Sequence, residues 1–166
     1  MSNRELRAWG DLITTVLIWG TYFVHFSQGV ASGDLARQGF VSSLGGHLAA
    51  ALILSIVAAF VVSLVVNLVR RDTPTQSQAD REAWAGLRAT RLAHGVIITL
   101  LMILTALALA LGAFAGPALA DQVDGWLGRS GTNGLILFAH AGLAILILAE
   151  LVHYGALIVL LGRDRR

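Results

Sequence analysis

The chain has 166 residues, of which 56% are hydrophobic and only 13% are charged. Average soluble proteins carry about 25% charged residues, and a small soluble domain leaves much of its surface in water. The composition therefore excludes a soluble enzyme and a disordered chain. The absence of cysteine excludes disulfides and thiol chemistry. All 12 basic residues are arginine and the net charge is only +2, so we expect no nucleic-acid partner.

Four apolar segments are long enough to cross a membrane as helices. They cover roughly residues 12–28, 48–69, 92–115 and 135–161. The first is the weakest because it contains several threonines and His25. A signal peptide is an alternative for this segment, but Trp19 and His25 interrupt its apolar run. The expected fold class is all-α: one domain over residues 1–166, built as an integral membrane four-helix bundle.

The distribution of arginine predicts the orientation of this bundle. Ten of the arginines lie at the two termini or in the middle loop with the helix start that follows it, residues 70–91, and only Arg37 and Arg129 lie in the other two loops. The positive-inside rule then places both termini and the loop 70–91 in the cytoplasm. The topology is up-down-up-down, and the expected location is a bacterial inner membrane, crossed several times.

Two loops contain signals of further helix. Pro74 ends any helix that precedes it, and Asp80 and Glu82 are acidic residues of the kind that favour a helix start, so we expect a short cytoplasmic extension of the third span. In the last loop, DQVDGWLG at residues 121–128 predicts a short interfacial helix with Trp126 at the headgroup level.

Residues 79–93, ADREAWAGLRATRLA, resemble a D-E-R motif followed by R-x-x-R. This pair of motifs opens the third span in a family of small bacterial four-helix membrane proteins. Arg88 and Arg91 match R-x-x-R, whereas spacing from Arg88 puts Ala79, Asp80 and Arg81 at the D-E-R positions, so this chain departs from the motif. The resemblance implies the same architecture and no known molecular function. It marks one cytoplasmic set of residues: Asp80, Arg81, Glu82, Arg88 and Arg91.

Five histidines lie in or near the spans, which is unusual for a chain of this size. Helix rise and alternating direction place His25 and His140 at one depth in the outer half, and His94 and His153 at one depth in the inner half. This is the pattern of two bis-histidine haem b sites or of a metal site. However, His140 and His153 point about 140° apart on one helix. The alternative is that interfacial histidines such as His47 are solvated and the deeper ones make hydrogen bonds between helices.

Glu150 is the strongest single signal, because it lies near the middle of the fourth span. An ionisable residue at that depth costs at least about 2.5–3.5 kcal/mol on insertion scales and usually faces the protein interior. His153 is three residues further on and shares its face. We therefore expect Glu150 and His153 to form a buried polar contact, which serves either to hold the helices in register or to handle protons.

Two classes of function remain open. The first is a non-enzymatic accessory or regulatory membrane protein without a cofactor or catalytic residue, which contacts lipid and, as one alternative, further copies of itself or other membrane subunits. The second is a redox or proton-handling protein that uses the histidines and Glu150. Small residues recur every four positions at Ala108, Gly112 and Gly116, which predicts close helix packing.

Overall fold

The computed structural model describes residues 2–34, 38–69, 75–114, 117–130 and 134–163. All the regular structure in these residues is α-helical, which confirms the all-α prediction. The helices are α1 (Asn3–Ser32), α2 (Gln38–Val69), α3 (Gln76–Phe114), α4 (Pro117–Ser130) and α5 (Gly134–Arg163).

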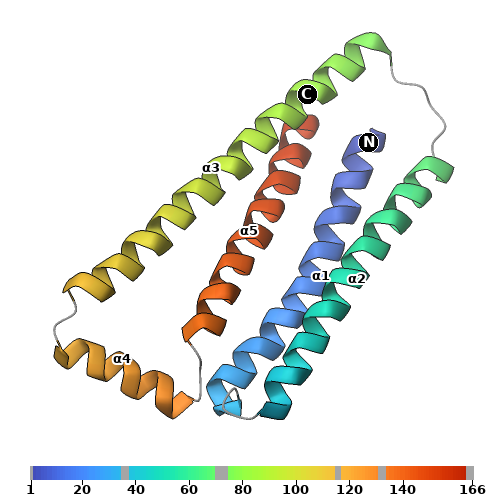
Figure 1. The fold of residues 1–166 in the computed structure, drawn as a ribbon. Helices are drawn as coiled ribbons and strands as arrows, with labels where there is room; N and C mark the ends of the chain where they lie inside the picture. The colour runs from blue at the N-terminus through green and yellow to red at the C-terminus, as the bar shows by residue number, and fades with distance from the viewer. Residues whose placement is uncertain (1, 35–37, 70–74, 115–116, 131–133, 164–166) are drawn as a thin grey trace.

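The four long helices lie side by side in the order α3, α5, α1, α2 (Figure 1). Consecutive long helices run in opposite directions, so the N-terminal end of α1 and the C-terminal end of α5 lie at the same end of the molecule. The short helix α4 lies across the opposite end, between α3 and α5. Within the described residues no packed interface forms between α2 and α3, so the helices form an open row and the predicted closed bundle is not confirmed.

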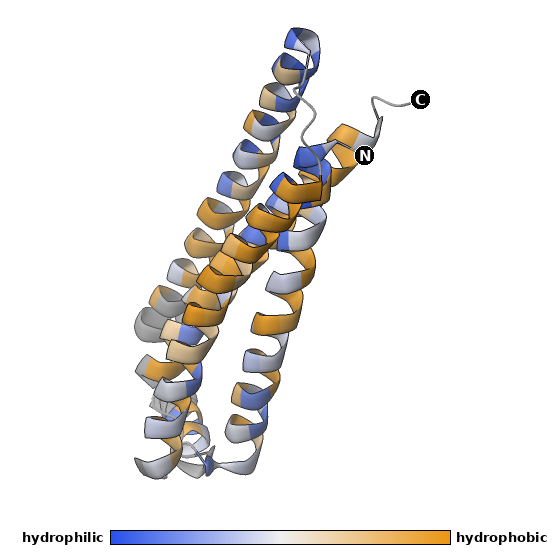
Figure 2. Cartoon of the chain, turned by 90° about the vertical axis from the view of Figure 1, so that its right-hand side faces the viewer, coloured by the Kyte–Doolittle hydropathy of each residue, from blue (hydrophilic) through white to orange (hydrophobic). Residues whose placement is uncertain are grey.

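Within the described residues, three helices are long and apolar enough to cross a membrane: Gly39–Val69, Gln76–Leu107 and Ile136–Gly162. Each contains one of the last three predicted spans or most of it. Apolar residues fill the middle of the long helices, and hydrophilic residues are more frequent toward their ends (Figure 2). The first predicted span, residues 12–28, lies within α1 but does not meet the same criterion of composition. Four membrane crossings therefore remain a prediction.

Helix α1 lies between α2 and α5, and its position explains its polar composition. Its buried residues recur at spacings of three, four or seven, which is the pattern of a coiled-coil seam: Glu5, Ala8, Thr15, Trp19, Tyr22, Phe26 and Gly29. The hydroxyl of Ser2 caps the helix by accepting from the Glu5 backbone N–H at 3.2 Å. The helix ends where Gly33 adopts a left-handed conformation with φ of 73°.

Two apolar clusters hold the row together. Trp19, Tyr22 and Phe26 of α1 pack with Leu44 and Ala51 of α2, and residues of α5 surround them. The second cluster lies near the chain termini. In it, the small residues Ala8 of α1 and Ala85 and Ala89 of α3 pack with Leu157 and Leu161 of α5.

Small residues therefore do allow close packing on α3, but at Ala85, Ala89 and Ala93. The predicted stripe at Ala108, Gly112 and Gly116 lies outside the residues whose side chains are described.

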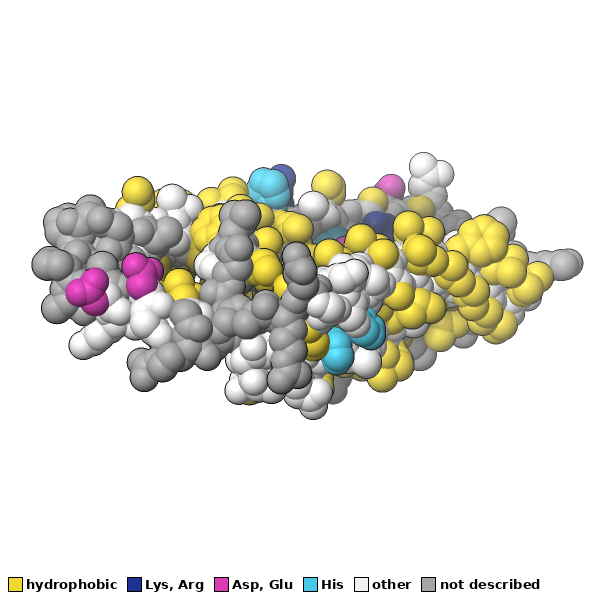
Figure 3. Space-filling model, turned by 60° about the horizontal axis from the view of Figure 1, so that its bottom comes forward, with side chains coloured by type: hydrophobic (Ala, Val, Ile, Leu, Met, Phe, Trp, Pro, Cys, Tyr) yellow, Lys and Arg dark blue, Asp and Glu magenta, His cyan; other side chains and the backbone are white. Residues whose placement is uncertain are grey.

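Both predicted helical extensions are present, and both are longer than expected. Helix α3 begins at Gln76, so most of the predicted loop 70–91 is helical. Helix α4 contains the predicted interfacial segment and covers 14 residues. Its Asp121 and Asp124 are exposed, and acidic side chains gather at this end of the molecule (Figure 3).

Candidate functional site: polar cavities along α1

A polar cavity of about 520 Å³ lies at the end of the row where the chain termini are found. All four long helices contribute to it. Its polar lining comes from Asn3, Arg4, Arg7 and Asp11 of α1, Ser63 and Asn67 of α2, Glu82 of α3, and His153 and Tyr154 of α5. Positive, negative and amide groups are all present, so the cavity suits water and small polar solutes.

A second, smaller cavity of about 120 Å³ adjoins the first, because Asp11 and Tyr154 line both. It lies between α1, α2 and α5. Its other polar side chains are Thr14 and Thr15 of α1, Ser55 of α2 and Glu150 of α5. Two carboxyl groups, those of Asp11 and Glu150, therefore face one small space from two different helices.

Hydroxyl groups along these cavities bond to the backbone of their own helices. Thr14 donates to the carbonyl oxygen of Gly10 at 2.9 Å, and Ser55 donates to that of Ala51 at 2.8 Å. Such bonds satisfy the hydroxyl proton where lipid offers no partner. The oxygen lone pairs remain able to accept from water in the cavity.

Asp11 makes an ion pair at the edge of these cavities. Its Oδ2 lies 3.9 Å from Nε of Arg7, one helical turn earlier, and its side chain is only 16% exposed. Asp11 lies just before the predicted first span, so sequence reasoning did not select it. The available signal was an acidic residue one turn after Arg7 at the start of an apolar segment.

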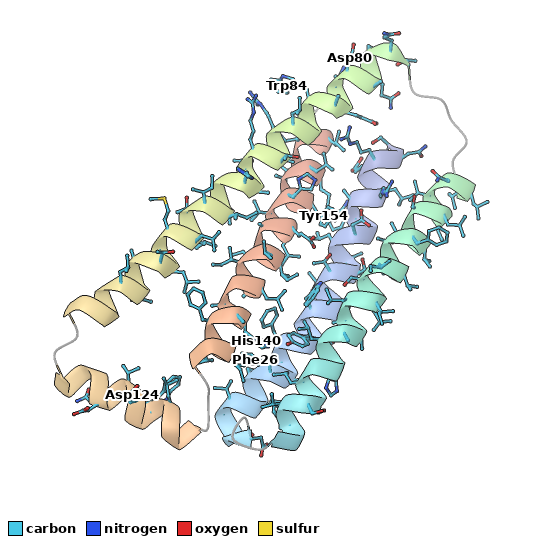
Figure 4. All side chains as sticks on the ribbon, in the orientation of Figure 1. Phe26, Asp80, Trp84, Asp124, His140 and Tyr154 are labelled. Carbon is cyan, nitrogen blue, oxygen red and sulfur yellow. The ribbon has the colours of Figure 1, made fainter. Side chains whose placement is uncertain are left out.

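Glu150 and His153 do not form the contact that their spacing predicts. Among the described residues no hydrogen bond joins them, because Glu150 faces the smaller cavity and His153 the larger one. Glu150 lines a cavity between three helices, but its side chain is still exposed in the isolated chain. Tyr154 lies between α5 and α1 (Figure 4), its ring 5.4 Å from that of His153.

The histidines are not paired as the haem hypothesis requires. His140 of α5 packs against Phe26 of α1, with ring centroids 3.8 Å apart and planes 3° apart, and the two residues lie together in Figure 4. His25 instead faces His47 of α2, with ring centroids 4.4 Å apart. His25 and His140 thus contact different neighbours, since consecutive residues 25 and 26 point about 100° apart around α1.

The two histidines of the inner pair in the haem hypothesis have different surroundings. His94 is exposed on α3, whereas His153 lines the large cavity from α5. No group of three or more histidine or acidic side chains able to hold a metal ion occurs in the residues that the structure describes.

The cytoplasmic motif set lies on the first turns of α3. Of its members only Glu82 lines the large cavity. The others are exposed: Asp80, Arg81, Arg88 and Arg91. The guanidinium of Arg88 lies 3.7 Å from the ring centroid of Trp84, and Trp84 points away from the neighbouring helices (Figure 4). This motif therefore faces outward, apart from Glu82.

Comparisons with protein-family models, with curated proteins and with solved structures gave no significant match to this chain. The resemblance to the four-helix family thus remains a prediction.

Proposed function

We propose that this chain is a multi-pass protein of a bacterial inner membrane that binds and releases protons at Glu150. The observation that carries this proposal is the pair of adjoining cavities along α1. Glu150 and Asp11 line the smaller cavity, and Asp11 and Tyr154 connect it to the larger polar one.

Electrostatics favour a shared proton in the smaller cavity. A single charge near the middle of a membrane helix costs at least about 2.5–3.5 kcal/mol on insertion scales. Two carboxylates facing one small space also repel each other, and one proton held between them removes that repulsion. The pair therefore favours a state with one bound proton and one charge, which Arg7 balances.

The larger cavity supplies a route for this proton. It is wide enough for several water molecules, and it lies at the end of the row that the arginine distribution assigns to the cytoplasm. The polar lining ends near Ile18 and Trp19, midway along α1. A path that reaches the middle of the membrane and stops there suits proton binding and release better than an open channel.

Infrared spectroscopy of the protein in lipid nanodiscs tests the protonation of Glu150. The wild-type protein should show a carboxylic-acid C=O band that titrates with pH, and Glu150→Gln should remove it. Asp124→Asn is the matched control, because it neutralises an exposed acid on α4 and should leave the band unchanged. An unaltered band in Glu150→Gln would refute the assignment.

Liposomes with an imposed membrane potential test whether proton binding leads to transfer. An internal pH dye should report uptake close to that of empty liposomes with the wild-type protein and with Glu150→Gln alike, because the polar lining stops midway along α1. Uptake by the wild type well above that of empty liposomes would contradict binding and release from one side of the membrane.

A second candidate function is that of an accessory subunit in a membrane assembly. The open row favours it, since α2 and α3 have no packed interface with each other in the described residues and both expose many large apolar side chains. Because the chain has no cysteine, single cysteines at Val65 on α2 or Ile98 on α3 would report a neighbour by cross-linking in native membranes. Cross-links at either position would support a subunit role, and their absence at both would argue against it.

A further inference from the structure

We propose that His25 of α1 and His47 of α2 form a binding site for a divalent transition-metal ion of the zinc or copper type. This site is separate from the carboxylate cavities and does not depend on the proposed proton chemistry. It lies toward the end of the α1–α2 pair that is opposite the N-terminus, where α1 ends and α2 begins (Figure 1).

The two imidazole rings come from different helices and lie in contact. Their centroids are 4.4 Å apart, and their planes are inclined by 44°. The ring of Phe40 also contacts His25, with ring centroids 5.5 Å apart. Histidine side chains are visible on the molecular face shown in Figure 3. His47 is exposed, so an ion can reach the pair from the side of this ring.

Hydrogen bonding leaves one nitrogen of each ring available. Nδ1 of His47 lies 2.8 Å from the backbone oxygen of Ser43, so it carries the proton and donates it there. The lone pair is then on Nε2, and such a bond to a carbonyl is the usual way in which a protein orients a metal-binding histidine. Nε2 of His25 is buried and has no hydrogen-bond partner among the described residues. A buried nitrogen without a partner is unusual in a folded protein, and an ion is one of its ordinary explanations.

The two histidines open onto a groove that has room for an ion and its water. This groove of about 420 Å³ between α1 and α2 is lined by both histidines, by Thr21 and Tyr22, and otherwise by apolar residues. Imidazole nitrogen is a preferred ligand of zinc and copper. Two protein ligands leave positions open for water, unlike the four-ligand sites that zinc uses to stabilise folds. A site of this kind binds its ion reversibly and does not stabilise the fold.

His140 and His94 differ from the His25–His47 pair in their hydrogen bonds and neighbours. Both nitrogens of His140 are engaged, Nδ1 with the backbone oxygen of Ile136 and Nε2 with the hydroxyl of Tyr22. His94 is exposed and makes no ring contact with another histidine among the described residues. His94→Gln is consequently a matched control for His25→Gln and His47→Gln.

Titration of Cu²⁺ into the full chain tests the proposal. The protein is purified through a tag without histidine, stripped of metal with a chelator and held in detergent. Elemental analysis should give one ion per chain, and calorimetry should show at least tenfold weaker binding by His25→Gln and by His47→Gln. The His94→Gln protein should bind as the wild type does.

Electron paramagnetic resonance of bound Cu²⁺ separates this site from nonspecific binding. Coupling to two imidazole nitrogens is expected in the wild type and to one in His47→Gln, the variant that alters an exposed side chain and so leaves the fold least disturbed. Equal affinity in all four proteins, no bound copper, or a spectrum that is the same in His47→Gln and wild type would overturn the proposal.

Discussion

The hydroxyl oxygen of Tyr22 lies 2.7 Å from Nε2 of His140, and this hydrogen bond joins α1 to α5 within the aromatic cluster. Nδ1 of His140 donates to the backbone oxygen of Ile136 at 2.7 Å. Nε2 is therefore the acceptor, and the hydroxyl of Tyr22 donates to it. Both nitrogens of a neutral ring are satisfied in this way, which identifies His140 as a structural residue that fixes the register of the two helices.

Loss of this bond should destabilise the protein measurably. Tyr22→Phe keeps the ring packing but leaves Nε2 of His140 without its donor, and hydrogen bonds between membrane helices contribute about 0.6–1.7 kcal/mol. We expect a loss of that size in the free energy of unfolding in detergent. A double-mutant cycle with His140→Leu should recover most of it as coupling energy.

The control for this cycle is Thr21→Val. Thr21 donates to the backbone oxygen of Leu17 on its own helix, so its removal should change stability by a few tenths of a kcal/mol at most. A coupling energy near zero between Tyr22 and His140 would show that the bond does not hold the helices.

Close packing of α3 depends on the absence of a large side chain at Ala89. Ala89 is fully buried in the cluster of small residues shared with α1 and α5. Ala89→Leu should destabilise the protein by about 1–3 kcal/mol, as overpacking of a core does, and the shift in unfolding midpoint measures this. Ala83→Leu makes the same change at an exposed position of the same helix and should have little effect. Similar losses in the two variants would contradict the close packing.

Two glycines of α1 should respond to alanine in opposite directions. A Cβ at Gly29 would overlap the ring of Phe40 on α2, whereas a Cβ at Gly20 meets nothing within 4 Å. Gly29→Ala should displace the ring of Phe40 from its contact with α1 and lower the free energy of unfolding. Gly20→Ala should raise it by up to about 1 kcal/mol, because alanine favours a helix more than glycine does. Thermal unfolding of both variants would measure these changes in stability. Stabilisation by Gly29→Ala would disprove the close contact.

The orientation inferred from arginine leads to a topology experiment. Reporter tags at Met1, Thr75 and Arg166 should report the cytoplasm, and a tag at Gly128 on α4 should report the periplasm. The physical reason is that arginine-rich loops stay on the cytoplasmic side during insertion. A cytoplasmic signal at Gly128 would contradict this orientation. A periplasmic signal at Met1, with the other three tags unchanged, would show that α1 does not span the membrane.

The sequence by itself determined the helical class and the position of the apolar helices. Long apolar runs can satisfy their backbone groups in lipid only as helices, so the last three predicted spans match α2, α3 and α5 apart from their ends. Composition also identified α4, although its length was underestimated. The unusual position of Glu150 was visible because a charge near the middle of an apolar segment stands out without any knowledge of its neighbours.

Only the tertiary structure decided which side chains meet. Depth along a helix follows from counting residues, but contact also depends on the direction of each side chain and on the order of the helices. His25 therefore meets His47 and not His140, and Glu150 shares a cavity with Asp11 and not with His153. The order α3, α5, α1, α2 places the most polar long helix between two neighbours. The periodicity within one segment cannot predict this order of helices, because the order results from packing between segments distant in the sequence.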